Sequence, residues 1–461
     1  MILKVYNFWQ ILKANFWFVP ALFCLAFMGL TIIIYALENA YWQNITLPDY
    51  IFQGTTDDAK SVVITLLSTM ITMATLAISI TIVVLSLAAS QLGPRLIKTF
   101  MADYKTKNFI GLFFGTVIAC FVLTVILHSR ASEAITPQIT ISLVFMLCLV
   151  NLFVLLGFVH HVAQSCIADN VILKVAEELK NALGRLANSQ SDYLPGKAVT
   201  DKDLIDKEVT DKDRSDKGAK QSISNAKWLN DPNITCQSIF FQYSGYVQNI
   251  DYDEIITLAE RENLRLEIDF KAGHFLVKGE AGFRVYSPTG LSESIEKELR
   301  NCFIIGATRT PTQDIEYSIR HLVEIAVRAL SPGINDSFTA MHVLDHLSSA
   351  LVILFEKETP ATDFYDSKSV KRMQAAQNDE ADIIFSALEQ VRYNGRAMPS
   401  IIRHLLEKIA ILAEIATKKK SKVALLEQVK CIQYDLQRFE EYIPELDALK
   451  RRANFLIKEL S

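Results

Sequence analysis

The sequence lacks the short motifs that mark the commonest nucleotide and hydrolase sites. It has no GxxxxGK[ST] loop to cradle phosphates, no GxGxxG turn for a dinucleotide and no GxSxG elbow for a serine nucleophile. It also has no compact pattern of basic and aromatic residues, and its net charge of −4 is small. Nothing therefore favours a nucleotide-dependent enzyme, a serine hydrolase or a nucleic-acid partner.

Paired cysteines are absent as well. The seven cysteines are scattered along 461 residues, and no two stand close enough in the sequence to form a zinc or redox motif. An odd, scattered set is typical of a reducing compartment, where free cysteines pack as small buried hydrophobes. The sequence therefore predicts no disulfide framework, no resident metal and no other cofactor.

Long hydrophobic runs are what the sequence does have. A helix needs about 20 apolar residues to cross the hydrocarbon core of a membrane. The first run is longer than the apolar region of a signal peptide, and no clear small-residue cleavage site follows it. The sequence predicts four transmembrane helices, at about 15–37, 61–90, 109–128 and 139–162.

The loops between these runs differ in their basic residues. The segment before the first run and the loop after the second are basic, through Lys4 and Lys13 and through Arg95, Lys98, Lys105 and Lys107. The other two loops hold only Lys60 and Arg130, beside several acids. Because basic loops stay in the cytoplasm, both termini and everything after about residue 163 are predicted to be cytoplasmic.

The second run carries hydroxyl side chains at helical spacing and no charge between Ser61 and Ser90. A polar face is expected to turn inward, away from lipid. Two interpretations stay open: close helix packing held by hydroxyls, or a polar path for ions or small solutes. Acids, lysines and arginines are missing from the span, which counts against a proton-coupled transporter. The candidate path consists of Thr65, Ser68, Thr72, Thr75 and Ser79.

Composition and periodicity divide the chain into five parts. A transmembrane domain at 1–165 and a connecting helix at 166–188 come first. The stretch 189–226 is rich in Lys and Asp and repeats the letters VTDKD, so a flexible polar insertion is predicted. Short apolar runs broken by glycines predict a small cytosolic α+β module at 227–291. Heptad-like apolar stripes predict a helical cytosolic domain at 292–461, whose helices need partners within the chain or in another subunit.

One loop of the helical domain reads ALSPGINDS, at positions 329–337. Pro332 disfavours helical geometry in the residue before it, and Gly333 is expected to take a left-handed conformation past the helix end. Asn335 or Asp336 is expected to cap the next helix. The sequence therefore predicts an antiparallel helical hairpin around this turn.

Polar residues stand near both ends of the first helix of this hairpin. Arg309 and Asp314 come at its start, and Arg328 lies in its last turn, close to Asn335 and Asp336. Because a helix rises 1.5 Å per residue, Asp314 and Arg328 are roughly 20 Å apart and cannot pair directly. Bridges within the chain are the simpler expectation, and binding of an anionic group is the alternative.

The letters HVLDH at 342–346 resemble the H-x-x-E-H zinc motif, with Asp345 in the place of Glu. His342 and His346 share a helical face, as two zinc ligands must. The shorter Asp345 would reach a metal-bound water less well, and the sequence signals no clear third ligand. A metal site is therefore not predicted here.

Three stretches in order carry a family resemblance: LAASQLGPRLIKTFMAD, SGYVQNIDYDEIITLAE and RTPTQDIEYSIRHLVEIAVRALSPGINDSFTA. Together they resemble the bacterial family of predicted membrane proteins called domain of unknown function 2254, from the first span to about residue 350 and more loosely beyond. In that family the Asn-Asp pair is usually followed by proline, whereas Ser337 stands here. A small residue fits a helix start, so the turn is expected to survive. The resemblance implies a multi-pass protein of the bacterial inner membrane and implies no reaction.

The leading functional hypothesis is a non-enzymatic homo-oligomer, channel-like or transport-related, whose second spans line a polar path. Its cytosolic region would assemble or gate the path. The alternative is a membrane-anchored scaffold or sensor whose polar cluster binds a partner or ligand. A metal-dependent membrane hydrolase at His342 and His346 is a weaker alternative. The expected partners are the lipid bilayer, further copies of the chain and ions or small solutes.

Overall fold

The computed structural model describes residues 15–41, 54–101, 103–129, 136–188, 234–357, 362–438 and 444–460. The chain divides into two compact units, Met1–Val171 and Ile172–Ser461. The basic tail before residue 15 and the predicted insertion at 189–226 lie outside the described residues.

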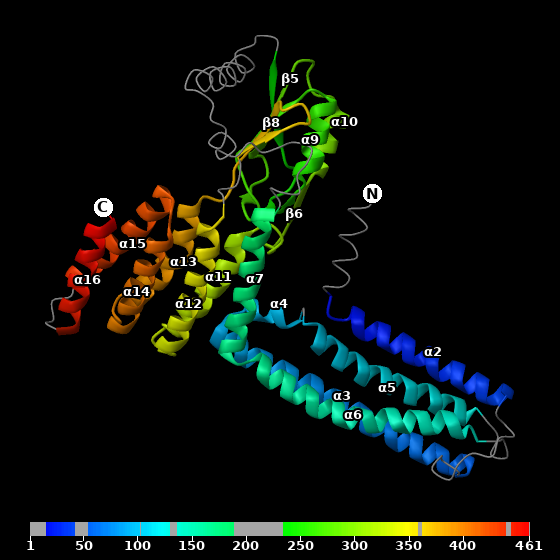
Figure 1. Ribbon diagram of the computed structural model, residues 1–461. Helices are drawn as coiled ribbons and strands as arrows, with labels where there is room; N and C mark the ends of the chain where they lie inside the picture. The colour runs from blue at the N-terminus through cyan, green and yellow to red at the C-terminus, as the bar shows by residue number, and fades with distance from the viewer. Residues whose placement is uncertain are drawn as a thin grey trace. The chain divides into compact units, whose positions relative to one another are not determined.

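The first unit is a bundle of apolar helices, drawn in blue to cyan-green in Figure 1. Each predicted span coincides with one of its long helices. These are α2 (Phe18–Tyr41), α3 (Thr56–Leu92), α5 (Tyr104–His128) and α6 (Gln138–Ser165), and a short α4 (Arg95–Met101) follows α3. The central helix is α5, which packs against α2, α3 and α6.

Local signals set the ends of these helices. Thr55 and Asp58 form a capping box at the start of α3, in which each side chain accepts a hydrogen bond from the other residue's backbone N–H. Gly93 ends α3 with a φ of 115°. The side chain of Asp103 caps α5 by accepting a hydrogen bond from the Thr106 N–H.

Close packing between α2 and α5 depends on two glycines of α5. A β-carbon at Gly111 would lie 2.7 Å from the Phe23 ring, and one at Gly115 would lie 3.1 Å from the Phe27 ring. The two phenylalanines of α2 therefore lie directly on the backbone of α5. Small residues commonly allow transmembrane helices to approach in this way.

Five described helices, rather than the predicted four, are long and apolar enough to cross a membrane. The fifth is α12 (Ser337–Phe355), which belongs to the second unit. Half of its most apolar window is buried inside the protein, and it packs against helices on either side. Its hydropathy therefore has a second explanation, because a core helix of a helical domain is also apolar.

The second unit contains most of α7 (Ala168–Asn188), which follows α6 directly. Its apolar side is buried, through Ile172, Val175 and Leu179. This helix coincides with the predicted connecting helix at 166–188.

The described residues of the α+β module form two sheets. The larger has the order β1 (Thr235–Phe240), β5 (Ala281–Ser287), β3 (Arg265–Ile268), β8 (Lys371–Ala375) and β7 (Asp363–Tyr365). The smaller has the order β4 (Phe275–Leu276), β2 (Gly245–Ile250) and β6 (Phe303–Gly306). The module also holds α9 (Tyr252–Arg261) and α10 (Glu293–Asn301). The β3–β8 pair is parallel and the other pairs are antiparallel.

The core of this module extends beyond the predicted range 227–291. Phe241 packs against the rings of Phe270, Phe283 and Phe303, and the last of these lies on β6. Met373, on β8, is fully buried in the same cluster. Strands β7 and β8 come from a charged stretch between two helices, where no strand was predicted.

In the rest of the unit the described residues form six helices, drawn in yellow-green to red in Figure 1. They are α11 (Ile315–Ala329), α12, α13 (Glu380–Gly395), α14 (Pro399–Ile415), α15 (Lys419–Gln437) and α16 (Pro444–Leu460). Helix α11 packs on α12 and α13, α12 on α14, α13 on α15, and α14 on α16. The result is a stack of helical hairpins whose apolar stripes are buried within the chain.

Candidate functional site

The ALSPGINDS turn joins two helices as the sequence predicts, but a different residue takes the left-handed conformation. Helix α11 ends at Ala329, and α12 begins at Ser337. Asn335 takes the left-handed conformation, with a φ of 52°, in place of the expected Gly333. Asparagine tolerates this region better than most residues. The exchange follows from the hydrogen bonds of the loop, in which the Asp336 N–H reaches back 2.7 Å to the Ala329 carbonyl.

Asp336 is the N-cap of α12. One carboxylate oxygen accepts a hydrogen bond from the Thr339 N–H at 3.0 Å, and the other accepts one from the Thr339 hydroxyl at 2.6 Å. These hydrogen bonds lower the pKa of Asp336 below its ordinary value. Both oxygens therefore serve the helix start.

Arg328 lies in the last turn of α11, where its Nε is 3.9 Å from the Glu324 carboxylate, one helical turn back. Arg309 and Asp314 are at the other end of the same helix. The five predicted cluster residues therefore occupy two separate places, one at each end of α11.

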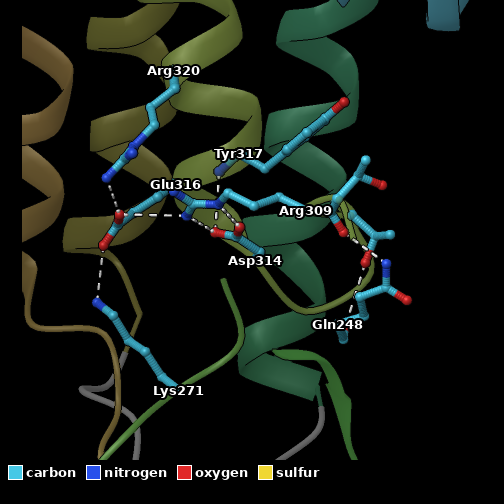
Figure 2. Close-up of polar contacts among 9 residues, drawn as sticks. Gln248, Lys271, Arg309, Asp314, Glu316, Tyr317 and Arg320 are labelled. Atoms are coloured by element: carbon cyan, nitrogen blue, oxygen red, sulfur yellow. Dashed lines mark hydrogen bonds and ion pairs between the residues drawn. The ribbon is translucent and has the colours of Figure 1, made fainter. Parts of the chain in front are cut away.

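The start of α11 carries the denser network of charges, shown in Figure 2. The guanidinium of Arg309 donates to both carboxylate oxygens of Asp314, from Nε at 2.5 Å and from Nη2 at 2.8 Å. Asp314 is only 3% exposed, and it also caps α11 by accepting a hydrogen bond from the Tyr317 N–H. A two-pronged ion pair of this kind fixes geometry as well as charge.

Glu316 extends the network. Its carboxylate is 2.9 Å from the Lys271 ammonium, 3.0 Å from Arg320 and 3.6 Å from Arg309. Burial alone would raise the pKa of Glu316, but the hydrogen bond and charge of Lys271, with Arg320 and Arg309, lower it overall. Lys271 belongs to the α+β module, so this network joins that module to the helical stack.

Gly273 lies against the ion pair and has a φ of +88°. A β-carbon there would be 2.4 Å from an Asp314 oxygen and 2.6 Å from the Arg309 guanidinium. Its N–H donates to the Val247 carbonyl at 2.8 Å. Only glycine fits this place. Sequence reasoning found Arg309 and Asp314 but missed Lys271 and Gly273 as their neighbours, because those residues are distant along the chain.

The hydroxyl stripe of α3 is exposed in the isolated chain. Thr65, Ser68, Thr72, Thr75 and Ser79 all lie on the outer side of the bundle. Of these, all but Ser68 donate their hydroxyl proton to the carbonyl four residues back, at 2.8 to 2.9 Å.

The opposite side of α3 makes the contacts within the bundle. Its buried residues include Val63, Met70, Ala74, Ala77 and Ala88. The stripe was expected to look inward, but this chain does not cover it. Small and flexible apolar side chains occupy the packed side instead.

Two further polar contacts tie the ends of the bundle together. The Glu38 carboxylate, on α2, accepts hydrogen bonds from the N–H groups of Ile139 and Thr140 at 2.7 and 2.9 Å, at the start of α6. At the other end, His161 Nε2 is 2.8 Å from the Asp103 carboxylate. Sequence reasoning missed Glu38 because it lies just past the predicted end of the first span.

The two histidines of the HVLDH stretch touch each other, with their Nε2 atoms 3.1 Å apart. The Asp345 carboxylate contacts α14, where its Oδ1 atom is 2.7 Å from His404 Nε2 and 2.7 Å from Lys408 Nζ. The described part of the chain contains no group of three or more His, Cys, Asp or Glu side chains arranged to hold a metal ion.

The comparisons with known proteins agree with the family resemblance of the three sequence stretches. The family described as "Predicted membrane protein (DUF2254)" matches residues 13–410. Uncharacterized proteins of Mycobacterium bovis and Mycobacterium tuberculosis are each 26% identical over 401 residues, which is 86% of this chain and 71% of theirs. No solved structure matches the chain. The protein therefore belongs to the DUF2254 family of predicted membrane proteins.

Proposed function

We propose that the chain assembles into a homo-oligomer in the bacterial inner membrane, and that its α3 helices line a polar path for ions or small solutes. The hydroxyl stripe of α3 carries this proposal, because it points away from the chain's own bundle. In lipid, polar side chains on the outside of a bundle favour contact with protein or water. Further copies of the chain would supply protein contacts and would enclose water between their α3 helices.

The proposal includes a topology of four transmembrane helices with both termini in the cytoplasm. Helix α12 is then a core helix of the cytosolic stack, supported by its packing between α11 and α14. Its N-terminal turn and cap are those of a helical hairpin. The α+β module and the helical stack would assemble or gate the path from the cytoplasmic side.

Cysteine accessibility tests the path. The seven native cysteines are replaced, and Thr72→Cys or Ser79→Cys is introduced in protein reconstituted into vesicles. A membrane-impermeant thiol reagent should label both positions, and mild oxidation should cross-link them between copies. Ala74→Cys, on the packed side of α3, and Phe153→Cys, on the exposed apolar side of α6, are the matched controls and should stay unlabelled.

Vesicle flux provides the independent measurement. Vesicles with the protein should pass ions or small solutes, and modification of Thr72→Cys should reduce that flux. Cross-linking without labelling or flux would make the stripe a dry helix contact and contradict the path. Reporter fusions after α2, α5 and α16 test the topology: an external signal from the last fusion would contradict four spans.

A further inference from the structure

The histidine pair of α12 has a geometry that the proposed path does not use. His342 and His346 are one helical turn apart on the same helix, and their ring centroids are 4.8 Å apart. Their Nε2 atoms approach to 3.1 Å. The two nitrogens form a hydrogen bond whose donor depends on the tautomer, and a bound ion would take the place of the shared proton.

The distance between the two Nε2 atoms is close to the distance between two nitrogen ligands of one metal ion. Imidazole nitrogens bind Zn²⁺ at about 2.0–2.1 Å, so two nitrogens in tetrahedral geometry lie about 3.3–3.4 Å apart. The pair therefore needs a shift of only a few tenths of an ångström to hold such an ion. Both rings are half-buried.

Lys180, on α7, lies close enough to act electrostatically on His346.

We propose that His342 and His346 form a two-nitrogen binding site for a transition-metal ion of the Cu²⁺, Ni²⁺ or Zn²⁺ class. Because the described residues contain no group of three ligands, water or small ligands from solution complete the coordination. Imidazole ligands select these ions over Mg²⁺ and Ca²⁺.

Calorimetry with Cu²⁺, Ni²⁺, Zn²⁺ and Mg²⁺ on the full chain, purified in detergent and stripped of metal, tests the site. One equivalent per chain should bind in the order of affinity Cu²⁺ above Ni²⁺ and Zn²⁺, with no heat from Mg²⁺. His342→Ala and His346→Ala should each weaken binding at least roughly tenfold. His404→Ala is the control, because that histidine pairs with Asp345, and it should bind as the original protein does.

Two further variants separate a site from a merely structural pair. His346→Asn keeps a hydrogen-bonding group, so it should retain the fold by gel filtration and circular dichroism while losing the metal. Lys180→Gln removes a nearby positive charge, so it should tighten binding several-fold. Electron paramagnetic resonance of the Cu²⁺ form should show two nitrogen ligands. Binding that survives loss of both histidines, or absence of stoichiometric binding to the original chain, would overturn the proposal and leave a shared proton as the reason for the contact.

Discussion

Gly273 and Asp314 approach so closely that a β-carbon built on Gly273 would lie 2.4 Å from the Oδ2 atom of Asp314. The contact joins two parts of the second unit. Gly273 comes from the α+β module, and Asp314 begins the first helix of the stack. The ion pair of Asp314 with Arg309 therefore lies where the two parts meet.

Gly273→Ala should destabilise the second unit by more than about 1 kcal/mol, because alanine is strained at positive φ and its methyl group would separate the ion pair. Gly279→Ala is the matched control, with a φ of +89° and open space around its β-carbon. Thermal unfolding in detergent should show a larger loss for Gly273→Ala. Equal losses would mean that backbone strain, and not contact with the ion pair, explains the glycine.

Removing Arg309 should cost about 3–5 kcal/mol, because it leaves the buried Asp314 carboxylate without its cation, whereas removing Asp314 should cost less because Glu316 stays 3.6 Å from Arg309. Arg309→Met and Asp314→Asn test this, since asparagine still caps a helix. A double-mutant cycle in denaturant should give a coupling energy well above that of an exposed pair. Additive effects of the two substitutions would contradict the pairing.

Glu316 should make the stability of the unit depend on acid. Its pKa is lower in the folded protein than its ordinary value of 4.5. The stabilisation is therefore complete above about that value and is lost as the pH falls through the lower, folded pKa. Unfolding midpoints from about pH 7 to about pH 4 should fall less steeply in Glu316→Gln than in the original chain. Glu407→Gln, on the exposed side of α14, should leave the slope unchanged.

Glu38→Leu should destabilise the transmembrane bundle by roughly 1–3 kcal/mol, because it leaves N–H groups at the start of α6 without their acceptor. Glu38→Gln keeps one acceptor oxygen and should lose less. Protease sensitivity of the α5–α6 connection and the thermal midpoint in detergent measure the effect. A Glu38→Leu protein as stable as the original would show that water replaces the carboxylate.

Periodicity alone predicted the features that depend on one helix. The hydropathy of the spans and the cap of α12 at Asp336 follow from residues near one another in the sequence. The hydroxyls of α3 recur at helical spacing, but periodicity carries no information about which side of the helix the bundle covers. That depends on packing against α5 and α6.

Contacts between distant segments were beyond the reach of local patterns. In the sequence Gly273 indicates only a break between strands. Its contact with Asp314 joins positions separated by several elements, so no local pattern shows it. Strands β7 and β8 are short and carry charge, so no alternating pattern marks them. Helix α12 has the composition of a span and the surroundings of a core helix, and composition alone does not separate the two.

The position of β8 has a consequence for the order in which the second unit is completed during synthesis. The chain leaves the sheets after β6, builds the α11–α12 hairpin and returns to pair β8 alongside β3. Until β8 has emerged from the ribosome, β3 presents an unpaired strand edge, which is a common site of aggregation. A nascent chain that ends after α12 would therefore contain a complete hairpin and an incomplete sheet. We expect chaperones to bind such a chain at the exposed edge of β3.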